Sequence, residues 1–232
     1  MPQFFDLSHA FDENTYHPFG FPHFQNREMY ASHGARHAIV TMSLHFATHM
    51  DAPWHMVENG KQLGSIGIAE LVGEALVVDL SADHGPARGN SGVVSRDEIL
   101  RALSSRGHDV RRGDALVVHT GWCGLYAADP TRYYAGYPTL SAEACEWVVK
   151  SGIRLVGVDA PDMDPPKSYQ EKPFSPMNHR MLLGHNVYVI ENVGGEVGAI
   201  LGERVLLIPA PMKLAGEYAS GAPVRLLATR LA

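Results

Sequence analysis

Short apolar runs alternate with amphipathic segments along this chain, and together they predict strands separated by helices. Four runs consist mainly of apolar, often β-branched residues, which is typical of strands buried on both faces. These four runs are residues 75–80, 115–120, 154–158 and 186–190. The pattern predicts further strands over residues 3–8, 36–46, 204–209 and 224–231.

Helices are predicted where capping residues precede amphipathic segments. A Ser-x-x-Glu capping box opens residues 95–104, and a serine N-cap opens residues 141–150. Residues 178–183 form a short helix, and residues 66–71 form a helical or turn segment. Because strands and helices alternate without repeats or a long polar linker, we expect one α/β domain over residues 1–232.

Four segments rich in glycine, proline, polar or aromatic residues lie between these elements, and we expect them to be irregular. They are residues 13–35, 82–92, 121–140 and 165–176. Long ordered loops in compact domains are often functional. The aromatic side chains of residues 13–35 are candidates either for an apolar substrate pocket or for ordinary packing beneath the loop.

The composition is that of an ordinary soluble globular protein, with 45% apolar and 19% charged residues. The net charge of −6 and the scattered basic residues argue against a nucleic-acid surface or an anionic-membrane patch. The N-terminus lacks the pattern of a secretory signal, and no apolar run reaches the roughly 18 residues of a membrane span. Cys123 and Cys145 form no Cys-x-x-Cys pair, which favours two reduced thiols in a cytoplasmic protein.

One stretch of eleven residues concentrates candidate metal ligands: His45-Phe-Ala-Thr-His49-Met-Asp51-Ala-Pro53-Trp-His55. Histidine is the commonest metal ligand at neutral pH, and a carboxylate adds a charged oxygen donor. Any one of these histidines alone would more often be a surface or core residue. Four such residues at this spacing indicate a metal site.

The spacing also restricts the backbone. On a helix, Asp51 would point roughly 200° away from His49, and Pro53 would end the helix. On a straight strand, His45 and His49 would stand about 13 Å apart, which is too far to share one ion. We therefore expect the chain to bend at or near Ala47.

Two further candidates lie downstream. His179 and Glu191 are twelve residues apart and bracket a short helix, a glycine turn and an apolar strand. A carboxylate at the C-terminal end of a strand points towards the crevice in which α/β proteins usually bind ligands. Glu191 has this position, so both residues are candidates for the same site.

The stretch from His45 to His55 resembles the His-x-Gly-Thr-His-x-Asp-x-Pro-x-His signature of the putative cyclase family, which includes bacterial kynurenine formamidase and isatin hydrolase. Weaker similarities follow in the same order along most of the chain. They lie at Phe5–His9, His119–Trp122, Gly157–Pro165, Asn178–Arg180 and Glu191–Asn192. Two departures stand out, because Ala47 replaces the glycine of the signature and Asp162 stands where the family commonly has serine.

The resemblance implies a swivelling β/β/α fold with a mixed sheet, a homodimer or homotetramer, and hydrolysis of an amide at a divalent metal. It implies that His45, His49 and Asp51 are metal ligands. His179 and Glu191 would complete this site or hold a second ion. His55 matches the proposed catalytic histidine of the family.

A site of imidazoles and carboxylates suits Zn²⁺ or Mn²⁺, as one ion or two. Either His55 or Glu191 is a candidate to move the proton to the leaving nitrogen. Aromatic side chains that could form an aryl-binding wall, or equally pack in the core, are Trp54, Phe19, Phe21 and Trp122.

The leading hypothesis is hydrolysis of a small aromatic amide, either an N-formyl aryl amine such as N-formylkynurenine or a cyclic amide such as isatin. A lactone or ring-ester hydrolase, or a cyclase, would use the same site. A non-catalytic metal-binding assembly protein is the alternative from another class. A serine or cysteine hydrolase fits less well, because no Gly-x-Ser-x-Gly elbow occurs and no base is expected beside either cysteine.

Overall fold

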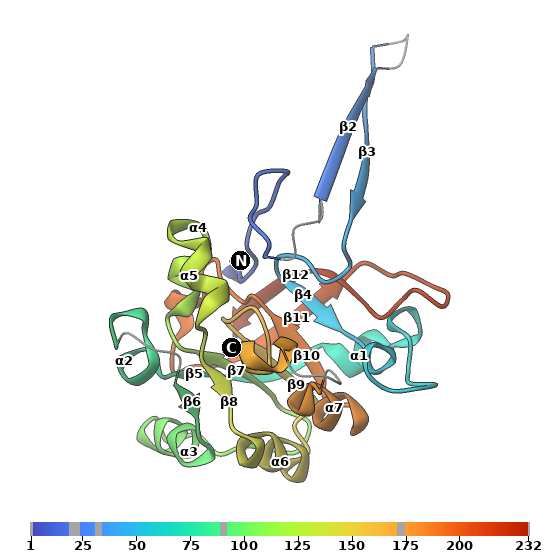
Figure 1. Ribbon diagram of the computed structural model, residues 1–232. Coiled ribbons are helices and arrows are strands. Elements are labelled where there is room, and N and C mark those ends of the chain that lie inside the picture. The colour runs from blue at the N-terminus through green and yellow to red at the C-terminus, as the bar shows by residue number, and fades with distance from the viewer. Residues whose placement is uncertain (1, 19–23, 31–33, 89–91, 171–174, 232) are drawn as a thin grey trace.

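A mixed eight-stranded sheet organises the protein (Figure 1). The structure is a computed structural model that describes residues 2–18, 24–30, 34–88, 92–170 and 175–231. The strands of the sheet are β1 (Phe4–Asp6), β4 (His49–Asp51), β5 (Gly73–Asp79), β7 (Ala115–His119), β9 (Leu155–Val158), β10 (Tyr188–Glu191), β11 (Arg204–Pro211) and β12 (Gly221–Arg230). Their order is β1-β12-β11-β5-β7-β9-β10-β4, and β12 also pairs with β4, so the sheet closes into a barrel. The predicted α/β class with a mixed sheet is confirmed.

The four central strands β5, β7, β9 and β10 are parallel neighbours and almost entirely buried. Successive side chains on a strand point to opposite faces. Ala75 and Val77 on β5 therefore pack with residues of β11 and β12, whereas Leu76 and Val78 pack towards the helices. Burial on both faces explains why these strands read as nearly continuous apolar runs.

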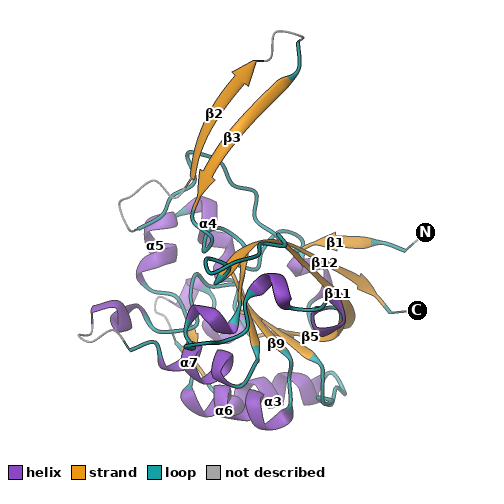
Figure 2. Ribbon diagram, turned by 90° about the vertical axis from the view of Figure 1, so that its right-hand side faces the viewer, coloured by secondary structure: helices purple, strands orange, loops and turns teal. Residues whose placement is uncertain are grey.

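Two helices, α3 (Arg96–Ser105) and α6 (Ala142–Ser151), pack against the outer face of the sheet (Figures 1 and 2). Both begin at the predicted serine N-caps, since the side chains of Ser95 and Ser141 accept hydrogen bonds from backbone N–H groups of the first turn. Helix α7 (Met177–Gly184) packs beside α6, in the predicted place.

The segment of residues 13–35 was wrongly expected to be irregular throughout. Strand β2 (Phe24–Tyr30) pairs with β3 (Arg36–Met42) in an antiparallel hairpin. The hairpin extends away from the barrel (Figures 1 and 2). Strand β3 is also shorter than predicted, because it ends at Met42 and leaves His45 on the bend that follows. A hairpin requires pairing between two strands, which the composition of one of them does not reveal.

Short helices replace two of the expected loops. The segment of residues 82–92 contains most of α2 (Ser81–His84) and a 3₁₀ turn, and the segment of residues 121–140 contains two helices, α4 and α5. The remaining elements are α1 (Ile68–Leu71), α4 (Leu125–Ala128), α5 (Pro130–Ala135), the paired strands β6 (Val93–Val94) and β8 (Thr139–Leu140), and 3₁₀ turns at Pro53–His55, Leu63–Ser65, Pro86–Arg88, Trp122–Gly124, Pro166–Gln170 and Val197–Ile200. Within the described ranges, no helix has the length and apolarity needed to cross a membrane.

Candidate metal centre

The predicted bend lies at Ala47. This residue has φ of +53°, in the left-handed region that non-glycine residues rarely adopt. The turn brings the ring centroids of His45 and His49 to 5.3 Å from each other, much closer than a straight strand would allow. Ala47, which replaces the glycine of the family signature, thus adopts the backbone conformation that glycine favours.

Strand β4 presents His49 and Asp51 on one face, because residues two apart on a strand point the same way. This strand lies between β10 and β12, and its register places Glu191 opposite His49. Nε2 of His49 is 3.3 Å from Oε2 of Glu191 and 3.5 Å from Oδ1 of Asp51. Two segments 140 residues apart in the sequence therefore meet through sheet pairing.

Helix α7 adds His179 to the same cluster. Its Nε2 lies 3.1 Å from Oε1 of Glu191 and 3.3 Å from Oδ2 of Asp51. All four side chains are buried, with exposed fractions of 1 to 4%. The structure brings His179 and Glu191 together, and they join His49 and Asp51 in one group.

Outer hydrogen bonds orient both imidazoles. Nδ1 of His49 donates to the Ala47 carbonyl at 2.9 Å, and Nδ1 of His179 pairs with Oδ2 of Asp164 at 2.7 Å. In metal sites, such a bond at one ring nitrogen fixes the tautomer and leaves the other nitrogen free to bind the ion. Here both Nε2 atoms face the carboxylates of Asp51 and Glu191.

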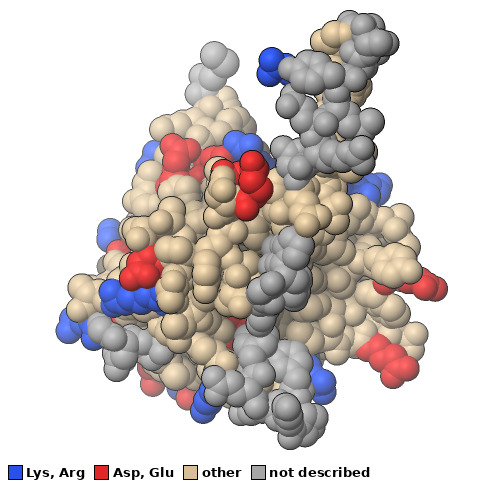
Figure 3. Space-filling view, turned by 45° about the horizontal axis from the view of Figure 1, so that its top comes forward, with Lys and Arg blue, Asp and Glu red and all other residues tan. Residues whose placement is uncertain are grey.

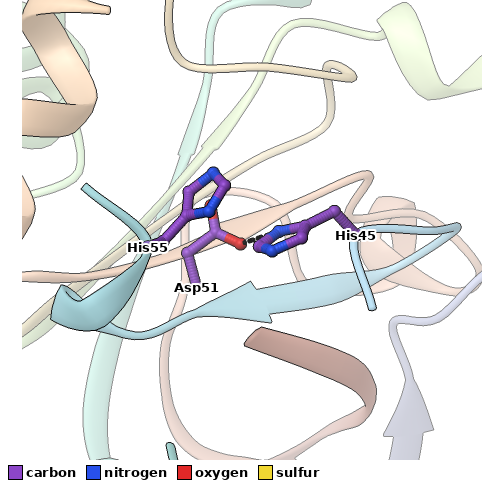
Figure 4. Close-up of side chains that lie close together, drawn as sticks. All are labelled: His45, Asp51 and His55. Carbon is purple, nitrogen blue, oxygen red and sulfur yellow. Dashed lines mark hydrogen bonds and ion pairs between the residues drawn. The ribbon is translucent and has the colours of Figure 1, made fainter. Parts of the chain in front are cut away.

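His45 and His55 both lie beside Asp51 (Figure 4). Nδ1 of His45 is 2.7 Å from Oδ1 of Asp51, and its Nε2 is 3.0 Å from Oγ of Ser220. His55 ends the 3₁₀ turn that Pro53 begins, and its ring stacks on that of His45 with centroids 4.0 Å apart. One ligand atom each from His45, Asp51 and His55 lie within 4.8 Å of one another.

Positive charge stabilises this cluster, because the carboxylates of Asp51 and Glu191 are buried in it. Burial opposes protonation of His49, but the carboxylates of Asp51 and Glu191 prevail and raise its pKa to about 9. Burial likewise opposes ionisation of Asp51, yet His45 and His49 hold its pKa well below the usual value. The carboxylates of this buried group need compensating protons or a cation.

The donor set fits a divalent cation. Oδ2 of Asp51 is buried and accepts no hydrogen bond within the described structure. Ligand atoms of His49, Asp51 and Glu191 lie within 4.8 Å of one another. Two imidazole nitrogens and two carboxylates without a thiolate form a set that zinc and manganese both accept.

His55 has a different environment from the other histidines of the group. Burial is the largest influence and lowers its pKa to about 4, with the neighbouring His45 and His179 acting in the same direction. The ring is therefore neutral at physiological pH and able to accept a proton.

Asp162, the second departure from the family signature, lies behind His179. Its Oδ1 is 3.7 Å from Nδ1 of His179, the nitrogen that faces away from Asp51 and Glu191. Burial and the nearby Glu191 raise the pKa of this carboxyl group well above its usual value. Sequence reasoning missed the role of Asp164, which anchors His179; its place in the Asp-Met-Asp-Pro segment was the available signal.

The four aromatic candidates for a substrate wall are placed differently. Trp54 is adjacent to His55 on the same 3₁₀ turn, and its indole N–H donates to the Glu217 carbonyl at 2.8 Å. Trp122 is 1% exposed and donates to the Tyr133 carbonyl at 3.0 Å, so its position favours the core-packing interpretation. Phe19 and Phe21 lie outside the described residues.

The chain is similar to known proteins in sequence and in fold. The family model described as putative cyclase matches residues 5–165. A kynurenine formamidase of Erythrobacter litoralis (strain HTCC2594) is 31% identical over 189 residues, which cover 75% of this chain and 69% of the relative. The chain belongs to the putative cyclase family.

Two solved structures illustrate the similarity in fold. Isatin hydrolase A from Labrenzia aggregata, bound to benzyl benzoate, superposes with a TM-score of 0.81 and 25% identity, covering 98% of this chain and 93% of that one. A potential metal-dependent hydrolase with cyclase activity has a TM-score of 0.75 and 23% identity, and all of both chains is covered.

Proposed function

We propose that this protein is a metal-dependent hydrolase that cleaves an amide C–N bond in a small molecule. One observation carries the proposal: Nε2 of His49 and Nε2 of His179 face the buried carboxylates of Asp51 and Glu191. The kynurenine formamidase relative and the isatin hydrolase neighbour both carry names of amide hydrolases, which supports the same reaction class.

His49, Asp51, His179 and Glu191 would hold the divalent cation, Zn²⁺ or Mn²⁺. His45, whose Nδ1 contacts Asp51, would be either a further ligand of this cation or part of a second ion site. When bound, such a cation polarises a carbonyl group and lowers the pKa of water from 15.7 to about 7. The chain itself supplies the orientation of the imidazoles through Ala47 and Asp164.

His55 is the residue that we assign to proton transfer. Its neutral ring accepts a proton from the attacking water and returns it to the leaving nitrogen, as amide hydrolysis requires a base and then an acid. Glu191 is less free for this role, because both of its oxygens face imidazoles and Oε1 also accepts the Met163 N–H at 2.8 Å.

The substrate class that we propose is a small aromatic amide, either an N-formyl aryl amine or a cyclic amide such as isatin. Trp54 precedes His55 on the same 3₁₀ turn, and we propose that its side chain contacts the aryl ring of the substrate. A lactone or ring ester presents the same kind of carbonyl to the same site, so it remains a substrate to be tested.

Activity assays with N-formylkynurenine, isatin and a dienelactone test the proposal. We expect turnover of one of the two amides to disappear in chelator and to return with Zn²⁺ or Mn²⁺. Full activity in metal-free protein would contradict the metal dependence. Bound metal without turnover of any of the three compounds would instead favour a non-catalytic metal-binding protein.

We also propose that residues 1–232 act as one domain that assembles into a homodimer or homotetramer. The hairpin of β2 and β3 extends from the body (Figure 1), and Ile39 and Val40 on β3 are 53% and 45% exposed. On the face that Figure 3 shows, basic side chains are interspersed with acidic ones. Light scattering on the purified protein measures the assembly, and a monomer at micromolar concentration would contradict it.

A further inference from the structure

A second group of metal-ligating side chains lies at the carboxyl ends of β7 and β9. His119 is the last residue of β7, Asp159 follows β9, and Cys123 lies on the 3₁₀ turn between them in sequence. The expectation that no base lies beside either cysteine was wrong. Gly121, with φ of +79°, turns the chain so that Cys123 returns over the strand end.

Three ligand atoms converge in this group. Nδ1 of His119 is 3.2 Å from Oδ2 of Asp159 and 4.0 Å from Sγ of Cys123. In a catalytic triad, the histidine uses one ring nitrogen for the nucleophile and the other for the carboxylate. Here the same nitrogen faces both partners, so the arrangement is not a proton relay. Convergence on one point is the arrangement that ligands adopt around an ion.

The distances are close to those of a tetrahedral zinc site. Bond lengths of about 2.0–2.2 Å to nitrogen and oxygen and about 2.3 Å to sulfur place neighbouring ligand atoms roughly 3.3–3.7 Å apart. The two separations from Nδ1 of His119 therefore need to change by only a few tenths of an ångström. The carboxylate is already oriented, because Oδ1 of Asp159 accepts hydrogen bonds from the N–H and hydroxyl groups of Thr120 at 3.0 and 2.7 Å.

Burial and charge also suit a cation. Asp159 is fully buried and His119 is 7% exposed, whereas Cys123 is only partly buried. Asp79, opposite His119 in the sheet register, adds a second carboxylate near the imidazole. A thiol, an imidazole and two carboxylates are thus gathered at neighbouring strand ends.

We propose that His119, Cys123 and Asp159 form a second metal site, which binds Zn²⁺ through sulfur, nitrogen and oxygen and leaves the fourth position to water. Binding releases the thiol proton to solvent and requires His119 to be unprotonated at Nδ1. The site differs from the first centre in chemistry, because a thiolate selects zinc over manganese or magnesium.

A spectroscopic titration tests this site independently of catalysis. The protein is first saturated with Mn²⁺ and then titrated with Co²⁺, whose bonds to thiolates give a charge-transfer band in the near ultraviolet. We expect the band to reach the intensity of one cobalt–thiolate bond per chain, to be lost in Cys123→Ser, and to persist in Cys145→Ser. Cys145 is a matched control, because it is fully buried and, among the described residues, belongs to no such group.

Absence of the band from the wild-type protein, or its loss only in Cys145→Ser, would overturn the proposal. If Cys123→Ser does not fold, alkylation of the wild-type protein gives the answer instead. Mass spectrometry should then find that Zn²⁺ protects Cys123 from iodoacetamide, and equal labelling with and without Zn²⁺ would contradict the site. The cobalt band and the alkylation of Cys123 both measure metal binding and not hydrolysis. They therefore test this site even if the amide-hydrolase assays fail.

Discussion

The carbonyl oxygen of Ala47 lies 2.9 Å from Nδ1 of His49, so the residue that bends the chain also orients a candidate metal ligand. The bend depends on φ of +53° at Ala47. A change at this residue is therefore expected to affect the folding of the segment and the position of the His49 ring together.

Replacing Ala47 tests the cost of this conformation. The left-handed region costs an alanine about 1–2 kcal/mol. Ala47→Gly removes that strain but loses a buried methyl group and adds chain entropy to the unfolded state, losses of about 0.8 and 0.5–1 kcal/mol. We expect the free energy of unfolding to change by less than about 1 kcal/mol, as measured by urea denaturation.

Ala47→Val is the contrasting variant. A β-branched residue fits poorly at positive φ, and Ala47 is 1% exposed, so added methyl groups meet packed neighbours. We expect a loss of more than about 2 kcal/mol in the same denaturation experiment. Equal stability of the glycine and valine variants would show that the backbone at this residue relaxes to negative φ.

Asp164→Asn tests the outer support of His179. This carboxylate accepts the His179 Nδ1–H and also the backbone N–H groups of Asn178 and His179 at the start of α7. Loss of such an outer partner typically weakens metal binding 10- to 100-fold, so we expect about that decrease by calorimetric titration with Mn²⁺. The control is Asp162→Asn, whose amide oxygen can still accept the Asp164 N–H, while the hydrogen bond between His179 and Asp164 is unchanged.

His55→Ala separates proton transfer from metal binding. Because the neutral His55 ring is our candidate base, its removal should lower kcat by about 10²–10⁴-fold while the metal content stays unchanged. His49→Ala should instead remove both the metal and the activity. Metal analysis by mass spectrometry together with amide hydrolysis distinguishes the two variants. A normal kcat in His55→Ala would contradict this assignment and would leave Glu191 as the candidate for proton transfer.

His9 makes stability depend on pH. Its ring stacks on Tyr126 at 3.8 Å, and burial lowers its pKa from 6.5 to about 4. Between these values the unfolded chain binds a proton that the folded protein does not, so stability falls as the pH falls from 6.5 to 4. At about 1.4 kcal/mol per pH unit, the contribution is at most about 3 kcal/mol.

The comparison with His9→Gln isolates this contribution. Both proteins are measured by denaturation at pH 7.5 and at pH 4, and the values at pH 7.5 correct for packing lost in the variant. We expect the wild-type protein to lose more stability than the variant over this range. The same pH dependence in both proteins would mean that His9 is protonated in the folded state.

Much of this protein can be predicted from the sequence, because the relevant signals are local. The apolar runs around Val77 and Val117 follow from burial on both faces of a strand, and the serine caps start their helices through hydrogen bonds within one turn. The bend at Ala47 follows from the distance that a straight strand would impose between His45 and His49. Each inference uses only residues that are near one another in the chain.

Tertiary structure alone decided which distant residues meet. The pairing of β4 with β10 brings Glu191 to His49, and the start of α7 brings His179 to Asp164. The same strand order places Asp159 beside His119, with Cys123 folded back over both. Such contacts depend on sheet order and register, which arise from the packing of the whole chain. Local periodicity therefore predicted the central strands, and the spacing of the candidate ligands predicted the bend, but neither contained information about these neighbours.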